Sequence, residues 1–137
     1  MDRPSIDYPF EHEATKATPY IKLDAAKGEI VIKGMSFPEN AKRFYYPVMR
    51  WVEEYSLVQT EHTIINIGLD YVNSGSVLTI VKLMKAFDFK IGAFGKVTIK
   101  WYYEENDNEI KQMGIDFQKM LSSPIELIKV RNIDQIS

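Results

Sequence analysis

Apolar and polar positions change their spacing several times along this chain, and each spacing predicts a different element. Two short strand-like runs, 20–23 and 29–33, are separated by a turn that ends in Gly28. Because glycine readily adopts a positive φ, this pattern predicts a β-hairpin. Residues 63–72 form a β-branched, largely apolar run that is long enough for a central strand. Residues 96–103 alternate as a half-buried strand does.

Three other segments carry apolar residues at the spacing of a helix with one buried face. The first follows the loop 34–40, in which Ser36 could cap the helix, and Pro47 is expected to kink or split it. The second begins directly after the strand 63–72. Outside these helices, residues 125–130 alternate between apolar and polar as in a possible final strand. The apolar positions of the three helices are Phe44, Val48, Trp51, Val52 and Tyr55; Val77, Ile80, Val81, Met84 and Phe87; and Ile110, Met113, Phe117, Met120 and Leu121.

The order of these elements is ββαβαβα, with a possible further β. Strand–helix–strand units form right-handed parallel crossovers, whereas the hairpin is antiparallel. We therefore expect a single-domain α/β sandwich, with a mixed sheet and helices packed on it. Residues 18–130 would form this domain, residues 1–17 a flexible N-terminal arm and residues 131–137 a C-terminal tail.

Composition narrows the possible functions. The 137 residues include no cysteine, which excludes disulfides, cysteine-ligated metals and thiol nucleophiles. Seventeen Lys and Arg residues against 19 Asp and Glu residues give a net charge of -2, which argues against binding to nucleic acid. No apolar run approaches the ~20 residues that span a bilayer, and the polar start does not resemble a signal peptide. We expect a cytoplasmic protein that binds no membrane and no cofactor.

The segment Asn73-Ser74-Gly75-Ser76 carries the most informative chemistry. It lies where a strand gives way to a helix, the place where α/β folds bind ligands and partners. A phosphate on a hydroxyl there would meet the N–H groups and the positive dipole end of the helix. Serine is also a common helix cap, so one of the two serines could serve only that role. We expect Ser76 to be the cap and Asn73 and Gly75 to shape the turn.

Carboxylates offer a second kind of chemistry. Asp70 could act as a base or bind a divalent ion, and Glu104, Glu105, Asp107 and Glu109 could bind a hard cation. The spacing of these acids fits no EF-hand loop. A solvated loop that leads into the negatively charged first turn of a helix explains them more simply.

Two further catalytic patterns are disfavoured. His12 lies in the expected arm, and His62 lies at the end of its strand opposite to Ser74, so a Ser–His pair is not expected. The segment Gly92–Lys96 is too short for a phosphate-binding loop and leads from a helix into a strand, which is the wrong order.

Taken together, several blocks of this sequence resemble the SiaC family of bacterial regulatory phosphoproteins. They occur in order from about Thr18 to Phe117, and the Ser-Phe-Pro-Glu-Asn and Asn-Ser-Gly-Ser blocks are the most specific. The blocks are Thr18-Pro19, Gly34 to Asn40, Phe44 to Trp51, Tyr71 to Ser76, Trp101 to Glu105 and Gly114 to Phe117.

The resemblance implies a fold of the STAS type, as in anti-sigma-factor antagonists, and a partner switch without enzymatic activity. In such a family a dedicated kinase phosphorylates the loop, a PP2C-type phosphatase removes the phosphate, and the unmodified protein activates a diguanylate cyclase. The family loop usually reads Asn-Thr-Ser-Ser, so its acceptor threonine matches Ser74 and one of its serines is replaced by Gly75.

Our hypothesis is therefore phosphorylation at Ser74, where the added charge would disrupt contact between the following helix and a partner. Three alternatives stay open at this point. Ser76 could be the acceptor, the protein could be an unmodified adaptor, or it could be a small metal-dependent enzyme that uses Asp70 or the 104–109 carboxylates.

Overall fold

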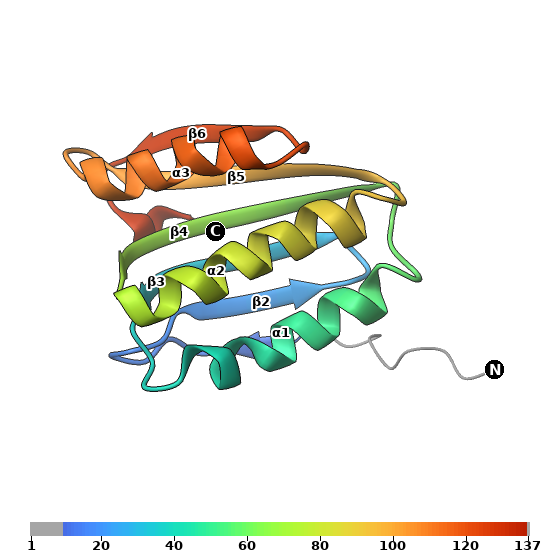
Figure 1. Ribbon diagram of the computed structural model, residues 1–137, viewed down its shortest axis with the longest axis horizontal. Helices are drawn as coiled ribbons and strands as arrows, with labels where there is room; N and C mark the ends of the chain where they lie inside the picture. Colours follow the sequence, from blue (N-terminus) through green and yellow to red (C-terminus); the bar gives the residue numbers. More distant parts are fainter. Residues whose placement is uncertain (1–9, 137) are drawn as a thin grey trace.

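A six-stranded β-sheet runs through the whole molecule, and its strands lie side by side in the order of the sequence (Figure 1). The computed structural model describes residues 10–136. Strands β1, β2 and β3 pair antiparallel, whereas β3 to β6 pair parallel. This confirms the mixed sheet. The strands are β1 (Phe10–His12), β2 (Tyr20–Asp24), β3 (Glu29–Ser36), β4 (His62–Val72), β5 (Lys96–Glu104) and β6 (Ile125–Val130).

The helices lie on one face of the sheet (Figure 1). Each parallel crossover moves one strand further in the same direction, so a constant right-handed connection places every helix on the same side. On this face lie α1 (Ala41–Tyr55), α2 (Ser74–Ala86), the π-helical turn η1 (Phe87–Ile91) and α3 (Asn108–Met120). The 3-10 turn η2 (Ile133–Gln135), which follows β6 and belongs to no crossover, lies on the opposite face.

The main core fills the space between this helical layer and the sheet. Trp101 of β5 is fully buried, and its indole N–H donates to the carbonyl of Ile110 at 2.8 Å. A Cβ on Gly114 would lie 2.5 Å from Cδ1 of Trp101, so only glycine lets α3 approach β5 this closely. The ring of Phe117 meets the indole edge-to-face, with centroids 5.4 Å apart. These contacts fix the position of α3.

The opposite face of the sheet is covered in part by the C-terminal residues, which differ from the expected tail. Ile133 and Ile136 are buried there against Val31 of β3. A Cβ on Gly68 would come within 2.2 Å of Cδ1 of Ile136, so this glycine makes room for the segment. The segment is also held at its end, where the ammonium of Lys33 donates to the carbonyl of Ile136 at 2.6 Å.

Three local expectations are corrected by the structure. Part of the expected N-terminal arm, Phe10–His12, is strand β1, because it pairs with β2; residues 1–9 of that arm lie outside the described part. The cap of α1 is Asn40, whose side chain accepts from the N–H of Arg43. Pro47 does not split α1, which runs unbroken through it; the proline is exposed, so water can reach the carbonyl left without a donor.

Ser36 has a different role from the expected cap. It is fully buried at the end of β3, and its hydroxyl lies 2.7 Å from the hydroxyl of Tyr45, which is equally buried. Each of these polar groups supplies the hydrogen-bond partner that the other needs inside the core.

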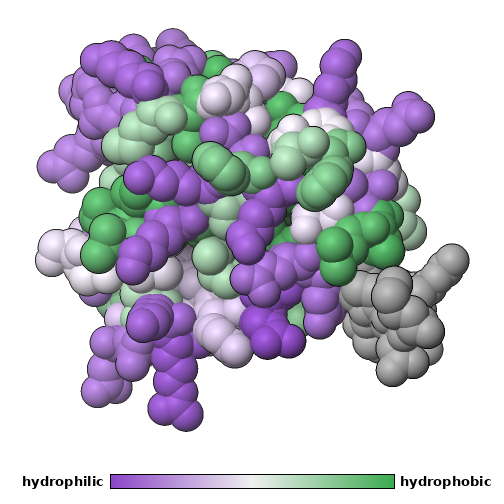
Figure 2. All heavy atoms as spheres, turned by 45° about the vertical axis from the view of Figure 1, so that its right-hand side comes forward, coloured by the Kyte–Doolittle hydropathy of each residue, from purple (hydrophilic) through white to green (hydrophobic). Residues whose placement is uncertain are grey.

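Exposed apolar side chains occur at both ends of the molecule. Leu57, Phe89 and Phe94 lie around the end where β4 and β5 begin, with Phe89 81% exposed. Figure 2 brings this end forward and shows hydrophobic side chains between hydrophilic ones. At the other end, where these strands finish, Tyr71 and Leu78 are exposed.

Candidate functional site

Ser74 lies at the junction between the longest strand and the helix that follows it. It is the first residue of α2, two positions after the end of β4, and it is exposed to solvent. The N–H of Asn73 donates to the carbonyl of Ser36 at 3.0 Å, which ties the junction to the neighbouring strand β3. The hydroxyl of Ser74 is therefore held at the surface on a fixed backbone.

Asn73, and not Ser76, caps α2. The amide oxygen of Asn73 accepts from the N–H of Ser76 at 3.0 Å, and Ser76 itself is the third residue of the helix. Ser76 points into the core: it is fully buried, and its hydroxyl has no hydrogen-bond partner among the described residues. Of the two serines, Ser74 is the one that a second protein can reach.

Gly75 is not needed for the turn on steric grounds. It is the second residue of α2, and a Cβ there would meet only the Asn73 side chain, at 4.0 Å. The expectation that Gly75 shapes the turn is corrected accordingly, because a larger side chain fits into the open space.

Loss of the Asn73 cap gives a testable effect on stability. Replacement by alanine leaves the N–H of Ser76 without its acceptor. We expect Asn73→Ala to lower the free energy of unfolding by about 1 kcal/mol, measured by urea denaturation. Gly75→Ala is the matched control and should leave stability unchanged or slightly raised. Equal stability of Asn73→Ala and wild type would contradict the cap assignment.

The chain segment around Ser74 carries no formal charge. No Asp, Glu, Lys, Arg or His occurs from Tyr71 to Val81. Within that stretch Tyr71 is 49% and Leu78 62% exposed, so apolar groups flank the hydroxyl in sequence. Our sequence interpretation had left Leu78 out of the apolar face of the helix. Leu78 does not share the helical spacing of the buried α2 residues Ile80 and Met84, and this offset was the available signal of its exposure.

Asp70 belongs to a different environment from that of Ser74. Asp70 is exposed, but partial loss of surrounding water raises its pKa to about 6, and the neighbouring Glu104 carboxylate adds to the rise through its charge and a shared hydrogen bond. Glu104 also accepts from the N–H of Ile133 at 2.9 Å, and Asp107 accepts from the N–H of Ile110 at the start of α3. Two acids of the 104–109 segment therefore have structural roles.

The raised pKa of Asp70 predicts how stability depends on pH. The folded state binds this proton more tightly than the unfolded chain, whose carboxyl has the ordinary value of 3.8. This contribution therefore favours folding at low pH and is lost as the pH rises through about 6. We expect Asp70→Asn to remove the part of the decline that this carboxyl causes. The measurement is the free energy of unfolding by urea at pH 4.5 and 7.5, which lie about 1.5 units on either side of 6. Glu61→Gln, on an exposed side chain, is the control; a decline that persists unchanged in Asp70→Asn would contradict this assignment.

Neither histidine lies near Ser74. His62 begins β4 and places Nε2 2.9 Å from the hydroxyl oxygen of Thr98, whereas Ser74 follows the other end of that strand. His12 lies in β1, with Nδ1 3.1 Å from the carbonyl oxygen of Pro19. The structure thus places both histidines away from the junction, in agreement with the sequence interpretation.

Residues 10–136 contain no group of three or more His, Asp or Glu side chains arranged to hold a metal ion. Within the same part of the chain, no helix has the length and apolar character needed to cross a membrane.

Comparison with known proteins supports the family that the sequence resemblance indicated. An uncharacterized protein of Pseudomonas aeruginosa strain UCBPP-PA14 is 22% identical over 113 residues, which cover 82% of this chain and 90% of that protein. Among solved structures, a chain in the complex of the diguanylate cyclase SiaD with its activator SiaC, from Pseudomonas aeruginosa, aligns with a TM-score of 0.80 at 21% identity. That alignment covers 88% of this chain and 99% of the other.

Apo-SiaC from the same organism aligns with a TM-score of 0.77 at 19% identity, over 88% of this chain and 98% of that one. At such identities the structural likeness establishes the fold, a single α/β domain. The family is established separately, because the model of the SiaC family of regulatory phosphoproteins matches residues 12–130, most of the chain. This protein therefore belongs to the SiaC family of regulatory phosphoproteins.

Proposed function

We propose that this protein is a non-enzymatic partner switch controlled by phosphorylation of Ser74. The unmodified form binds and activates a diguanylate cyclase or a similar effector. A dedicated kinase phosphorylates Ser74 and a PP2C-type phosphatase restores the hydroxyl. The observation that carries the proposal is the exposure of Ser74 as the first residue of α2, in a chain of a regulatory phosphoprotein family.

The local chemistry supports Ser74 as the acceptor. A phosphate at the first position of a helix lies at the positive end of the helix dipole, which stabilises the anion. The burial of Ser76 speaks against the other serine, since a kinase needs the hydroxyl at the surface. The alternative of Ser76 as acceptor would require the first turn of α2 to unfold.

The same chemistry explains how the phosphate would act as a switch. It adds a charge of about -1.5 to -2 to a stretch that has none. A partner that packs on the exposed apolar groups beside Ser74 would have to desolvate this charge without a compensating cation. Support for the kind of partner comes from the relative described as an activator in complex with the diguanylate cyclase SiaD.

Intact-mass spectrometry of the protein purified from its source organism tests the proposal. We expect a population heavier by one phosphate group, lost in Ser74→Ala and retained in Ser76→Ala. Treatment with a PP2C-type phosphatase should remove the added mass. A shift that persists in Ser74→Ala would contradict the site, and the absence of any shift under all growth conditions would favour the unmodified adaptor.

A further inference from the structure

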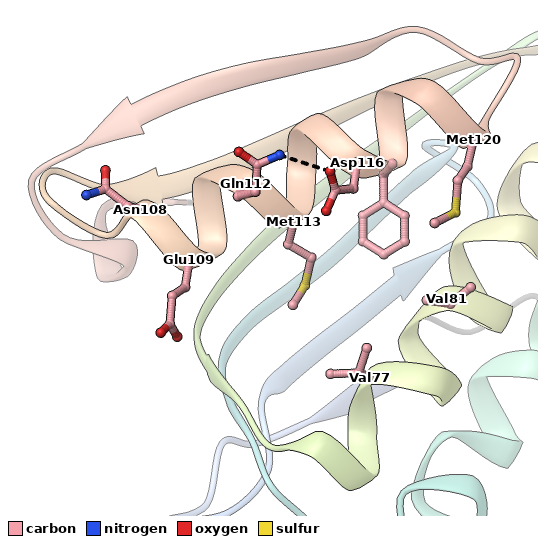
Figure 3. A pocket seen from close by; sticks show the side chains of 9 residues that line it. Val77, Val81, Asn108, Glu109, Gln112, Met113, Asp116 and Met120 are labelled. Carbon is pink, nitrogen blue, oxygen red and sulfur yellow. Dashed lines mark hydrogen bonds between the residues drawn. The ribbon is translucent and has the colours of Figure 1, made fainter.

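The most exposed apolar side chains lie together at the end of the molecule where β4 and β5 begin, the end brought forward in Figure 2. Phe89 is 81%, Leu57 72% and Phe94 71% exposed, more than any other large apolar side chain in the described part of the chain. We call these three residues the end patch. It shares no residue with the groove of about 500 Å³ between α2 and α3, which Val77 and Met120 line on the helical layer (Figure 3). Single exposed apolar residues are common, whereas a group of them marks an interaction surface.

Two neighbouring turns hold the end patch in place. Leu57 belongs to the turn after α1 and Phe94 to the turn between η1 and β5, and both line one hollow of about 360 Å³. The carbonyl of Ile91 joins the two turns. It accepts from the side-chain amide of Gln59 at 2.9 Å and from the N–H of Phe94 at 3.2 Å. The exposed side chains are therefore attached to a fixed backbone, so a partner would meet a preformed surface.

The charged groups at the edge of the end patch are of both signs. Glu53, in the last turns of α1, forms an ion pair with Lys90 of η1 at 3.3 Å. Glu61 and Lys96 are also neighbours, because the N–H of Lys96 donates to the carbonyl of Glu61 at 2.8 Å. A surface of a single strong charge, such as anionic lipid, finds no complementary field here. A second copy of this chain does, since a two-fold contact can bring the acids of one copy to the lysines of the other.

We infer that two copies of this chain associate through the end patch in a two-fold symmetric contact, with the mixed charges at its rim. Phe89 and Phe94 together expose roughly 300 Å², because a buried aromatic side chain covers about 150–250 Å². Each partner of a typical stable interface buries about 800 Å². The end patch supplies the apolar centre of such an interface but not its whole area. We therefore expect a weak dimer in equilibrium with the monomer.

This contact leaves the proposed switch site free. The end patch lies where β4 begins, whereas Ser74 follows the other end of that strand. The 11 residues of β4 separate the two ends by about 36 Å, at roughly 3.3 Å per residue. In the dimer each copy keeps Ser74 at its far end, so association and phosphorylation are independent. The inference thus goes beyond the proposed function and does not depend on it.

Sedimentation velocity of the full chain measures this association. The apparent mass of wild type should rise from the 15.9 kDa of one chain toward twice that value between about 1 and 500 µM, where weak contacts become occupied. Leu57→Asp and Phe94→Asp should each raise the dissociation constant at least about tenfold, since the carboxylate would be desolvated without a partner. The matched control is Leu78→Asp, at a leucine that is 62% exposed beside Ser74, and it should associate as wild type does. All three replaced side chains are exposed, so circular dichroism should show unchanged folding.

A mass of one chain at every concentration, or equal weakening by Leu57→Asp and Leu78→Asp, would overturn the inference. A mass above that of two chains would also overturn it, because a two-fold contact closes at the dimer. Ser74→Asp should leave the association unchanged, and a loss would place the contact at the other end. Binding of wild type, but not of Leu57→Asp, to vesicles of phosphatidylcholine and phosphatidylglycerol would assign the end patch to a membrane instead. The phosphate on Ser74 is measured separately by intact mass, so a failed dimer and a failed switch give different results.

Discussion

Ser74→Asp is expected to weaken binding to the effector about ten- to a hundredfold, whereas Ser74→Ala should bind as the unmodified protein does. The aspartate places a fixed negative charge beside the exposed apolar groups of an otherwise uncharged stretch. A tenfold loss of affinity corresponds to about 1.4 kcal/mol. Desolvation of one unpaired carboxylate at a contact readily costs this much. True phosphorylation carries about twice the charge and should have the larger effect.

The measurement compares tagged wild type, Ser74→Ala and Ser74→Asp as baits in the source organism. A diguanylate cyclase retained by the first two and lost with the third would be identified by mass spectrometry, and its dissociation constants would then be measured with purified proteins. Ala26→Asp is the control, because Ala26 is exposed in the β2–β3 turn at the other end of the sheet. Equal affinity of all the variants would show that Ser74 does not control this contact.

Trp101→Ala is expected to lower the free energy of unfolding by about 3–5 kcal/mol, the largest effect on stability that we predict. The indole is fully buried, so its removal leaves a cavity under α3. The carbonyl of Ile110 also loses the N–H that it accepts at 2.8 Å, and Phe117 loses its aromatic partner. Since domains are stable by only about 5–15 kcal/mol, such a loss approaches the whole margin.

Urea denaturation followed by circular dichroism measures this effect. The control is Phe89→Ala, an aromatic residue that is 81% exposed, which should change stability by less than about 0.5 kcal/mol. A cost of less than about 1 kcal/mol would mean that the neighbouring side chains collapse into the space, contrary to the close packing at Gly114.

The main elements of the fold could be predicted because their signals are local. A β-branched apolar run such as 63–72 can bury both faces, and it became the central strand β4. The three helices showed helical spacing, and the alternation at 125–130 became β6. The face predicted for α2 was wrong in part, because Val77 is exposed and Leu83, which it omitted, is buried. From the order of these elements and the constant hand of parallel crossovers, the sheet and its helical layer follow.

The errors came from residues whose role depends on a distant partner. Phe10–His12 has no clear period of its own and becomes a strand only because β2 pairs with it. Ile133 and Ile136 are buried because Gly68, in another element, leaves them space. Asn73 and Ser76 both have side chains that can cap a helix, and the choice between them depended on where α2 begins and which side it buries.

By itself, the sequence determined the order of the elements, the family resemblance and the place of Ser74 after the central strand, since each of these depends on neighbours along the chain. Only the tertiary structure decided that Ser74 is exposed while Ser76 is buried, and that Val77 and Met120 line one groove. The physical reason is that burial and grooves arise where elements pack against one another, so one element's own periodicity shows that it has an apolar face but not what covers that face.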